Sequence, residues 1–135
     1  MKKFGLSAEE RIRSKKEFDL LYSNGKTLVS ASQKFKAVYF FEKNLNPEFK
    51  PEVKVAFAVH RKAGKAVWRN RVKRLLRVSY RLNKESLINS CYSKNRSLFV
   101  AFSPFSVNCK NYNKINLKDV MPDIIELIHS LGQKK

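Results

Sequence analysis

Cysteine is scarce in this chain of 135 residues, and long apolar runs are missing. The two cysteines, Cys91 and Cys109, are too few for a disulfide framework and lack the spacing of metal ligands, so we expect free, reduced thiols. No apolar run approaches the roughly 20 residues that a membrane-spanning helix needs. The first residues also lack the apolar core of a secretory signal. The sequence therefore predicts a cytoplasmic protein without a membrane partner.

Catalytic and metal-binding patterns are missing as well. His60 and His129 are the only histidines, and neither has a carboxylate or cysteine pattern around it. The eleven acidic residues are scattered singly and in pairs, without the spacing of a metal site. We therefore predict no catalytic residue, no metal ligand and no small-molecule substrate in this chain. Any reaction that it serves is expected to be carried out by its partner.

Positive charge is what the chain has in excess. Its 29 lysines and arginines against 11 acidic residues give a formal net charge of +18. Such a charge destabilises a compact state by self-repulsion and is typical of proteins that bind a polyanion. Disorder does not explain it, because the hydrophobic content of 43% is that of a globular protein. A membrane surface is the weaker of two candidate anions, since no isolated amphipathic surface helix is evident. Nucleic acid is the favoured partner.

A short first helix is predicted over residues 14–23. Ser14 and Glu17 have the S-x-x-E spacing of a capping box, in which each side chain satisfies a free backbone N–H group. Apolar residues follow at helical spacing, and Asn24 with Gly25 is expected to end the helix in the left-handed conformation.

Two further helices are predicted later in the chain. The longer one begins near Ala66 and runs to about Ser86, with an apolar arc of Val67, Trp68, Val72, Leu75, Leu76, Ser79 and Leu82. The last helix covers residues 117–131, and we expect it to become regular only around Pro122.

Alternating or continuous apolar residues predict four strands, at residues 26–32, 36–42, 53–60 and 97–103. Residues 44–52 contain two prolines and are expected to form a loop. The fourth strand is almost entirely apolar, which is typical of a central strand covered on both faces. The element order α-β-β-β-α-β-α indicates an α+β two-layer sandwich in which three helices pack on a four-stranded mixed sheet. We expect one domain over residues 1–135, with flexible ends at about 1–8 and 132–135.

The long helix carries the most informative charge pattern. Between Lys54 and Lys84 there are eleven basic residues and no acidic residue. A charged helix face is usually only solvated, but such a face mixes signs and pairs glutamate with lysine at i, i+4. Here the i, i+4 pairs are like-charged, as in Arg69–Lys73 and Lys73–Arg77, so a ligand that neutralises them is the simpler explanation. Arginine suits this role because its planar fork matches phosphate groups.

A basic loop precedes this helix. Gly64 lies between Lys62 and Lys65, and we expect it to let the backbone approach a ligand near the helix amino end, where anions are favoured. With Arg61, Lys62 and Lys65, this loop extends the binding surface predicted for the helix.

Aromatic residues form a second candidate element. Phe18 and Tyr22 lie one helical turn apart, and Tyr39 and Phe41 share one face of the second strand. Each of the four is as well explained as part of the core. On an open sheet face, however, such rings stack unpaired bases at about 1–3 kcal/mol per base. A groove of this kind suits single-stranded RNA.

Two segments resemble a known family. The sequences Lys62-Ala-Gly-Lys-Ala-Val-Trp-Arg-Asn-Arg-Val-Lys-Arg-Leu-Leu-Arg77 and Arg11-Ile-Arg-Ser-Lys-Lys-Glu-Phe-Asp-Leu-Leu-Tyr-Ser-Asn-Gly-Lys26 are similar to two blocks of the bacterial ribonuclease P protein component. The order of elements also agrees from about residue 6 to residue 131.

This resemblance implies an accessory subunit that binds the catalytic RNA of ribonuclease P and the 5′ leader of precursor tRNA. The RNA would carry the metal-dependent hydrolysis in tRNA 5′ maturation, with Mg²⁺ bound mainly by RNA. By position, the residues that would bind RNA are Arg61, Lys62, Lys65, Arg69, Asn70, Arg71, Lys73, Arg74 and Arg77. Phe18, Tyr22 and Tyr39 would line the leader-binding cleft. The family also implies a left-handed β-α-β crossover, whereas general topology rules predict the right-handed form.

Two other functions compete with this one. A ribosomal or other structural RNA-binding protein would have the same electrostatics, and a self-sufficient nuclease would act without an RNA subunit. Both alternatives remain open on the sequence alone.

Overall fold

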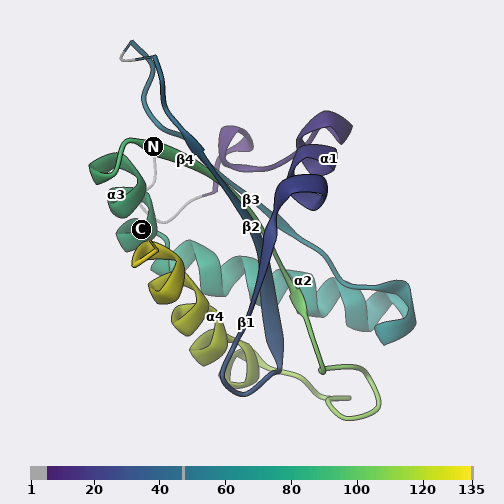
Figure 1. Cartoon of the computed structure of the whole chain (residues 1–135). Helices are drawn as coiled ribbons and strands as arrows, with labels where there is room; N and C mark the ends of the chain where they lie inside the picture. The colour runs from purple at the N-terminus through teal and green to yellow at the C-terminus, as the bar shows by residue number, and fades with distance from the viewer. Residues whose placement is uncertain (1–5, 47, 135) are drawn as a thin grey trace.

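The computed structural model describes residues 6–46 and 48–134 (Figure 1). Its centre is a four-stranded sheet in the order β1-β2-β4-β3. The strands are β1 (Lys26–Val29), β2 (Phe35–Lys43), β3 (Val53–Phe57) and β4 (Arg96–Pro104). β2 pairs antiparallel with both β1 and β4, whereas β3 pairs parallel with β4. The predicted mixed sheet is therefore confirmed, with the first and third strands shorter than expected.

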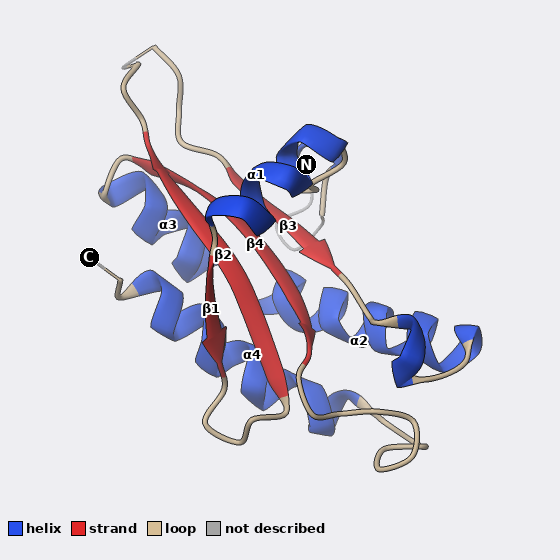
Figure 2. Cartoon of the chain, turned by 45° about the vertical axis from the view of Figure 1, so that its right-hand side comes forward, coloured by secondary structure: helices blue, strands red, loops and turns tan. Residues whose placement is uncertain are grey.

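Helices cover the two faces of the sheet unequally. Helices α2 (Ala66–Asn83), α3 (Glu85–Ser93) and α4 (Leu117–Gly132) lie on one face, and α1 (Lys15–Asn24) lies on the other (Figure 2). Short 3-10 turns precede α1 and α2, at η1 (Ala8–Glu10) and η2 (Arg61–Ala63). None of the helices in the described part of the chain is long and apolar enough to cross a membrane.

The described residues contain four α-helices, so the prediction of three was wrong. The expected helix to residue 86 ends at Asn83, and α3 starts at Glu85. Lys84 between them keeps a nearly helical backbone, with φ of −73° and ψ of −21°. Its ammonium group lies 2.6 Å from the Glu10 carboxylate and is almost fully buried. Because no glycine or proline marks this junction, the sequence pattern runs through it without interruption.

The core is divided by the sheet into two clusters. Leu98, Val100 and Phe102 of β4 belong to the larger cluster, under α2, α3 and α4. The alternate residues Phe99 and Ala101 belong to the smaller cluster, which α1 helps to cover. Successive side chains of a strand point to opposite faces, so β4 is buried on both. This confirms the expectation for the fourth strand.

The connection from β3 to β4 is left-handed. In Figure 2 both strands run downward, β3 lies to the right of β4, and α2 and α3 pass behind the sheet. A crossover of parallel strands with this arrangement has the rare hand. The structure therefore agrees with the expectation from the family resemblance and not with the general rule.

The ends of α1 and α4 differ from the expectations. The Ser14 cap of α1 is confirmed, because its hydroxyl accepts a hydrogen bond from the Glu17 N–H. Gly25 is extended, with φ of −77°, so the predicted left-handed stop was wrong. α4 is regular from Leu117, where the Asn116 side chain caps it, and Pro122 does not delay it as expected.

Hydrogen bonds hold the carboxyl-terminal end of α4 against the end of α3. The Gly132 carbonyl accepts bonds from Ser90 Oγ and Lys94 Nζ, and the Lys134 carbonyl accepts from Lys94 Nζ and the Arg96 guanidinium. Of the ends expected to be flexible, residues 1–5 and 135 lie outside the described residues.

Candidate nucleic-acid interface

Helix α2 turns one face into the core and the opposite face outward. Its buried residues are Trp68, Val72, Leu76, Ser79 and Tyr80. The Tyr80 ring packs between Phe57 and Phe102, with ring centroids 6.0 and 5.8 Å away. Sequence periodicity did not identify Tyr80 as part of this face. Its packing rotates the buried arc away from the expected one.

That rotation exposes two residues that were predicted to be apolar contacts. Val67 is 83% exposed and Leu82 is 45% exposed. Val67 therefore stands among the cations of α2 and not in the core. Helical periodicity correctly predicted an amphipathic helix, but it assigned Val67 and Leu82 to the buried face.

The outward face of α2 carries the predicted cations side by side. Four of them, Arg71, Lys73, Arg74 and Arg77, line a shallow hollow of about 550 Å³ together with Val67 and Asn70. We call the cations Arg69, Arg71, Lys73, Arg74 and Arg77 the basic ridge. All five predicted positions from Asn70 to Arg77 are thus brought together on one surface.

No carboxylate in the described part of the chain forms an ion pair with this ridge. The ion pairs that join described residues are Glu17–Lys54, Glu52–Lys54 and Glu10–Lys84, and none involves a ridge cation. Lys84, which follows the last residue of α2, has its charge paired and buried. A row of like charges without counter-charges has a strong positive potential, which attracts a polyanion.

Backbone hydrogen bonds fix two of the ridge arginines. Arg69 Nε donates to the Gly64 carbonyl at 3.0 Å, and Arg71 Nε donates to the Ile115 carbonyl at 2.6 Å. Both bonds use Nε, so the two terminal nitrogens of each guanidinium are not needed for them and can contact a phosphate. Because these two side chains are already held in place, binding a phosphate costs them less conformational entropy than it costs a freely rotating arginine.

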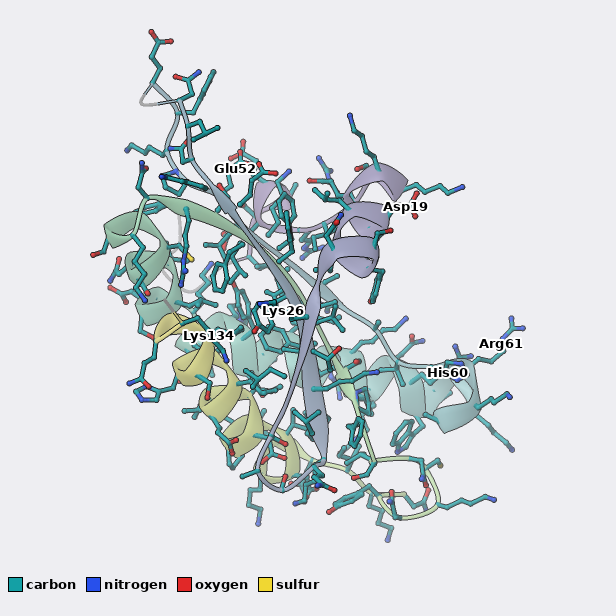
Figure 3. All side chains as sticks on the ribbon, viewed as in Figure 1. Asp19, Lys26, Glu52, His60, Arg61 and Lys134 are labelled. Carbon is teal, nitrogen blue, oxygen red and sulfur yellow. The ribbon has the colours of Figure 1, made fainter. Side chains whose placement is uncertain are left out.

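The loop before α2 continues the positive surface. Arg61, Lys62 and Lys65 are exposed. The Lys62 N–H donates to His60 Nδ1, which caps the η2 turn, and Figure 3 shows the Arg61 side chain extending outward at this end of the molecule. Gly64, at the end of η2, lies close to core residues. A Cβ atom there would lie 2.7 Å from the Trp68 ring and 2.9 Å from Cys109 Cβ, so the close approach is to the core.

A second hollow, of about 630 Å³, lies beside the first turn of α2. One side is built from η2 and α2, and the other from the loop between β4 and α4; the lining residues are Lys62, Ala63, Gly64, Lys65, Val67, Trp68, Arg71, Asn108, Cys109, Lys110 and Asn113. Sequence reasoning missed the contribution of this loop. Its basic and asparagine-rich composition was the available signal.

The aromatic residues do not all meet. Phe18 and Tyr22 stack on α1, with ring centroids 6.4 Å apart, and Tyr22 is 54% exposed. Phe18 packs against the smaller core cluster on the α1 side. Tyr39 belongs to the larger cluster on the opposite face. Because side chains alternate along β2, the structure separates Tyr39 from the predicted cleft.

No cluster of three or more potential metal-ligating side chains occurs among residues 6–46 and 48–134. Glu17 is one acidic residue with a shifted pKa. The hydrogen bond from Lys54 Nζ, at 2.7 Å, lowers the pKa of its carboxyl below the usual value. This ion pair connects α1 to β3.

Comparison with known proteins places these features in a family. The family model described as Ribonuclease P matches residues 6–115. A ribonuclease P protein component of Clostridium botulinum (strain Loch Maree / Type A3) is 34% identical over 124 residues, which cover 92% of this chain and 96% of the relative. One of Clostridium acetobutylicum is 36% identical over 107 residues, or 79% of this chain and 80% of the relative.

Solved structures share the fold. The ribonuclease P protein from Thermotoga maritima superposes with a TM-score of 0.65 and 24% identity, over 90% of this chain and 96% of that one. The corresponding protein from Staphylococcus aureus gives a TM-score of 0.61 and 18% identity, over 92% and 95%.

Proposed function

This chain belongs to the ribonuclease P protein component family, and we propose that it binds the catalytic RNA of ribonuclease P through the basic ridge. The observation that supports this most is the row of cations on α2, which no carboxylate among the described residues pairs. Neutralising phosphates releases counterions from RNA and relieves repulsion between neighbouring arginines. Arg61, Lys62 and Lys65 extend the same surface around the amino end of α2.

We further propose that the chemistry belongs to the RNA subunit. In this view the RNA holds Mg²⁺ and hydrolyses the phosphodiester bond that joins the 5′ leader to the tRNA. The protein contributes binding and orientation. The scarcity of clustered ligating side chains in the described part of the chain supports this division.

Precursor tRNA is the proposed second ligand. The stacked rings of Phe18 and Tyr22 stand on the α1 side of the sheet, and Tyr22 offers an exposed face. Unpaired bases of a 5′ leader would stack there without strong sequence preference. Tyr39 has no part in this proposal, because it belongs to the larger cluster on the opposite face of the sheet.

Reconstitution tests the proposed function. Cleavage of precursor tRNA by a bacterial ribonuclease P RNA at low Mg²⁺ should be stimulated by this protein, and the protein alone should not cleave. Cleavage by the protein alone would favour the self-sufficient nuclease. Depletion in cells should leave tRNA with unprocessed 5′ leaders, and normal 5′ ends would favour a structural RNA-binding protein instead.

Salt dependence tests the ridge itself. Arg74→Ala should weaken binding to the RNA and reduce the slope of log K against log salt by about one unit, as the loss of one phosphate contact does. Lys43→Ala, at an exposed position at the end of β2, is the matched control and should leave the slope unchanged. Equal slopes for Arg74→Ala and the unmodified protein would remove Arg74 from the interface.

A further inference from the structure

The second hollow, at the amino end of α2, has features that phosphate binding alone does not require. We propose that this hollow, which we call the amino-end pocket, receives one unpaired nucleotide of the bound RNA. The base would enter among Ala63, Val67 and Trp68, and its phosphate would lie near Lys62 and Lys65. This inference rests on the proposed function, because it deepens how the chain binds RNA.

The walls of the amino-end pocket are held together by hydrogen bonds between distant parts of the chain. The Cys109 N–H donates to the Ala63 carbonyl at 2.7 Å, and Trp68 Nε1 donates to the Tyr112 carbonyl at 2.9 Å. With the Arg71–Ile115 bond described above, these bonds join the loop after β4 to the first two turns of α2. A pocket with fixed walls binds a ligand without an ordering cost.

Charge around the pocket favours an anion. Lys62, Lys65, Arg71 and Lys110 all contribute to the lining, which contains no acidic residue. No side chain among the described residues caps α2, whose N-cap position is Lys65. The first-turn N–H groups and the helix dipole therefore add to the positive potential of the lysines.

Apolar surface distinguishes a nucleotide from a bare phosphate as the occupant. Val67 is 83% exposed on the rim, beside the Trp68 ring and Ala63. An isolated anion gains nothing from such carbon atoms, whereas a base buries its faces against them. The volume of about 630 Å³ lies within the range of roughly 300–1,000 Å³ found for small-molecule sites.

Amide groups at the far wall suit a base edge. Asn113 is exposed and lines the pocket, and Asn108 holds the loop by accepting N–H bonds from Lys110 and Asn111. An asparagine amide offers one acceptor and two donors, the pattern that base edges match. Continuity with the basic ridge through Val67 and Arg71, which line both hollows, points to the same RNA molecule.

Cys109 provides the test, because it lines the pocket and the other cysteine, Cys91, is only 1% exposed. Alkylation of Cys109 with N-ethylmaleimide adds a bulky neutral group without removing any cation. We expect binding to ribonuclease P RNA to weaken about tenfold, the loss of roughly one stacked base, while the salt slope stays unchanged. Cys109→Ser, compared before and after the same treatment, should show no change and so excludes an effect through Cys91.

Protection of the unmodified protein gives a second, independent measurement. Saturating ribonuclease P RNA should slow alkylation of Cys109, and precursor tRNA alone should not. Protection only by precursor tRNA would still support a nucleotide in the pocket but would assign it to the substrate. No protection by either RNA, or unchanged affinity after alkylation, would overturn the proposal.

The two levels of the hypothesis fail differently. If Arg74→Ala changes the salt slope but alkylation of Cys109 has no effect, the ridge binds RNA and the pocket is empty. If neither the ridge variant nor alkylation affects binding, the proposed function itself fails. Circular dichroism and urea denaturation establish that the alkylated protein remains folded.

Discussion

At the scale of single residues, the glycines show how a correct boundary can have an unexpected cause. Gly25 ends α1, as its place in the sequence indicated, but its φ of −77° is open to any residue. The constraint is space: a Cβ atom there would lie 2.3 Å from the Leu21 carbonyl oxygen and 3.1 Å from that of Tyr39. Backbone atoms cannot move aside as a flexible side chain does. Sequence shows that a glycine is present, but not which of its properties is used.

A pair of alanine substitutions tests this reading. Gly25→Ala should lower the free energy of unfolding by about 1–3 kcal/mol, since the backbone must shift to admit the methyl group. Gly132→Ala, in the last turn of α4, meets only Ser90 at 3.8 Å. It should be neutral or stabilise by up to about 1 kcal/mol, because alanine favours the helix. Urea denaturation measures both, and equal effects would contradict the explanation.

The Glu17–Lys54 pair predicts a specific dependence of stability on pH. Hydrogen bonding from Lys54 lowers the pKa of Glu17 in the folded protein, relative to an ordinary value near 4.5. Its contribution is therefore fully present above that value and is lost as pH falls through the lowered pKa. Both side chains are 22% exposed, so the contribution is at most about 1 kcal/mol.

Glu17→Gln should thus be less stable than the unmodified protein at pH 7, and the difference should shrink as pH falls below about 4.5. Urea denaturation at pH 7, 5 and 3.5 would measure the difference in the free energy of unfolding between the two proteins. The control is Glu48→Gln, at an exposed loop position where the carboxylate forms no ion pair with another described residue, and it should not alter the pH dependence. A difference that stays constant with pH would exclude the pair as its source.

At the scale of elements, alternation along β2 separates two aromatic roles. Tyr39→Ala should lower the free energy of unfolding by about 3 kcal/mol, because a ring of the larger cluster is lost. Tyr39→Ala should change the binding of leader-bearing precursor and of mature tRNA to the same extent. Phe18→Ala should weaken binding of the leader-bearing precursor more than that of mature tRNA. Equal losses for Phe18→Ala would show that Phe18 serves only the core.

Sequence periodicity predicted every strand and the three longest helices, because each has an apolar face of sufficient length. It failed where the packing of neighbours decides. At the break between α2 and α3, Lys84 forms an ion pair with Glu10, more than seventy residues away in the chain. The rotation of α2 about its axis, which leaves Val67 exposed, brings Tyr80 into contact with Phe57 and Phe102. Neither contact leaves a local signal.

The candidate site was predicted to the same degree. Charge without counter-charge identified the ridge from the sequence alone, since that pattern is local to α2. The wall of the amino-end pocket formed by residues 108–113 was missed, because it is built when a loop after β4 reaches the amino end of α2. Tyr39 was assigned to the cleft without knowledge of which sheet face α1 covers.

At the scale of the whole molecule, the handedness of the β3-α2-α3-β4 connection is beyond local rules. The general preference for right-handed crossovers would have placed α2 on the face that α1 occupies. In the observed hand, α2, α3 and α4 share one layer and α1 remains alone on the other face. The family resemblance supplied the correct hand where the physics of single elements did not.

Net charge leads to a prediction for the free protein that is opposite to the one for its complex. A formal charge of +18 stores repulsion in the folded state, and the basic ridge on α2 is one place where like charges lie close together. Salt screens charges beyond a Debye length of about 10 Å at 0.1 M. The melting temperature of the free protein should therefore rise by several degrees between about 20 and 200 mM KCl. The stabilisation that ribonuclease P RNA adds should fall over the same range.

Thermal melts with and without RNA measure both trends. Arg74→Gln combined with Arg77→Gln removes two neighbouring ridge charges. This double variant should reduce the salt dependence of the melting temperature and of the stabilisation by RNA, because repulsion and RNA attraction arise from the same groups. Lys43→Gln with Lys118→Gln removes the same charge from exposed positions outside the ridge and should preserve more of each trend. If the free protein instead melts at one temperature across the salt range, the ridge stores no repulsion. Relief of that repulsion would then contribute nothing to RNA binding.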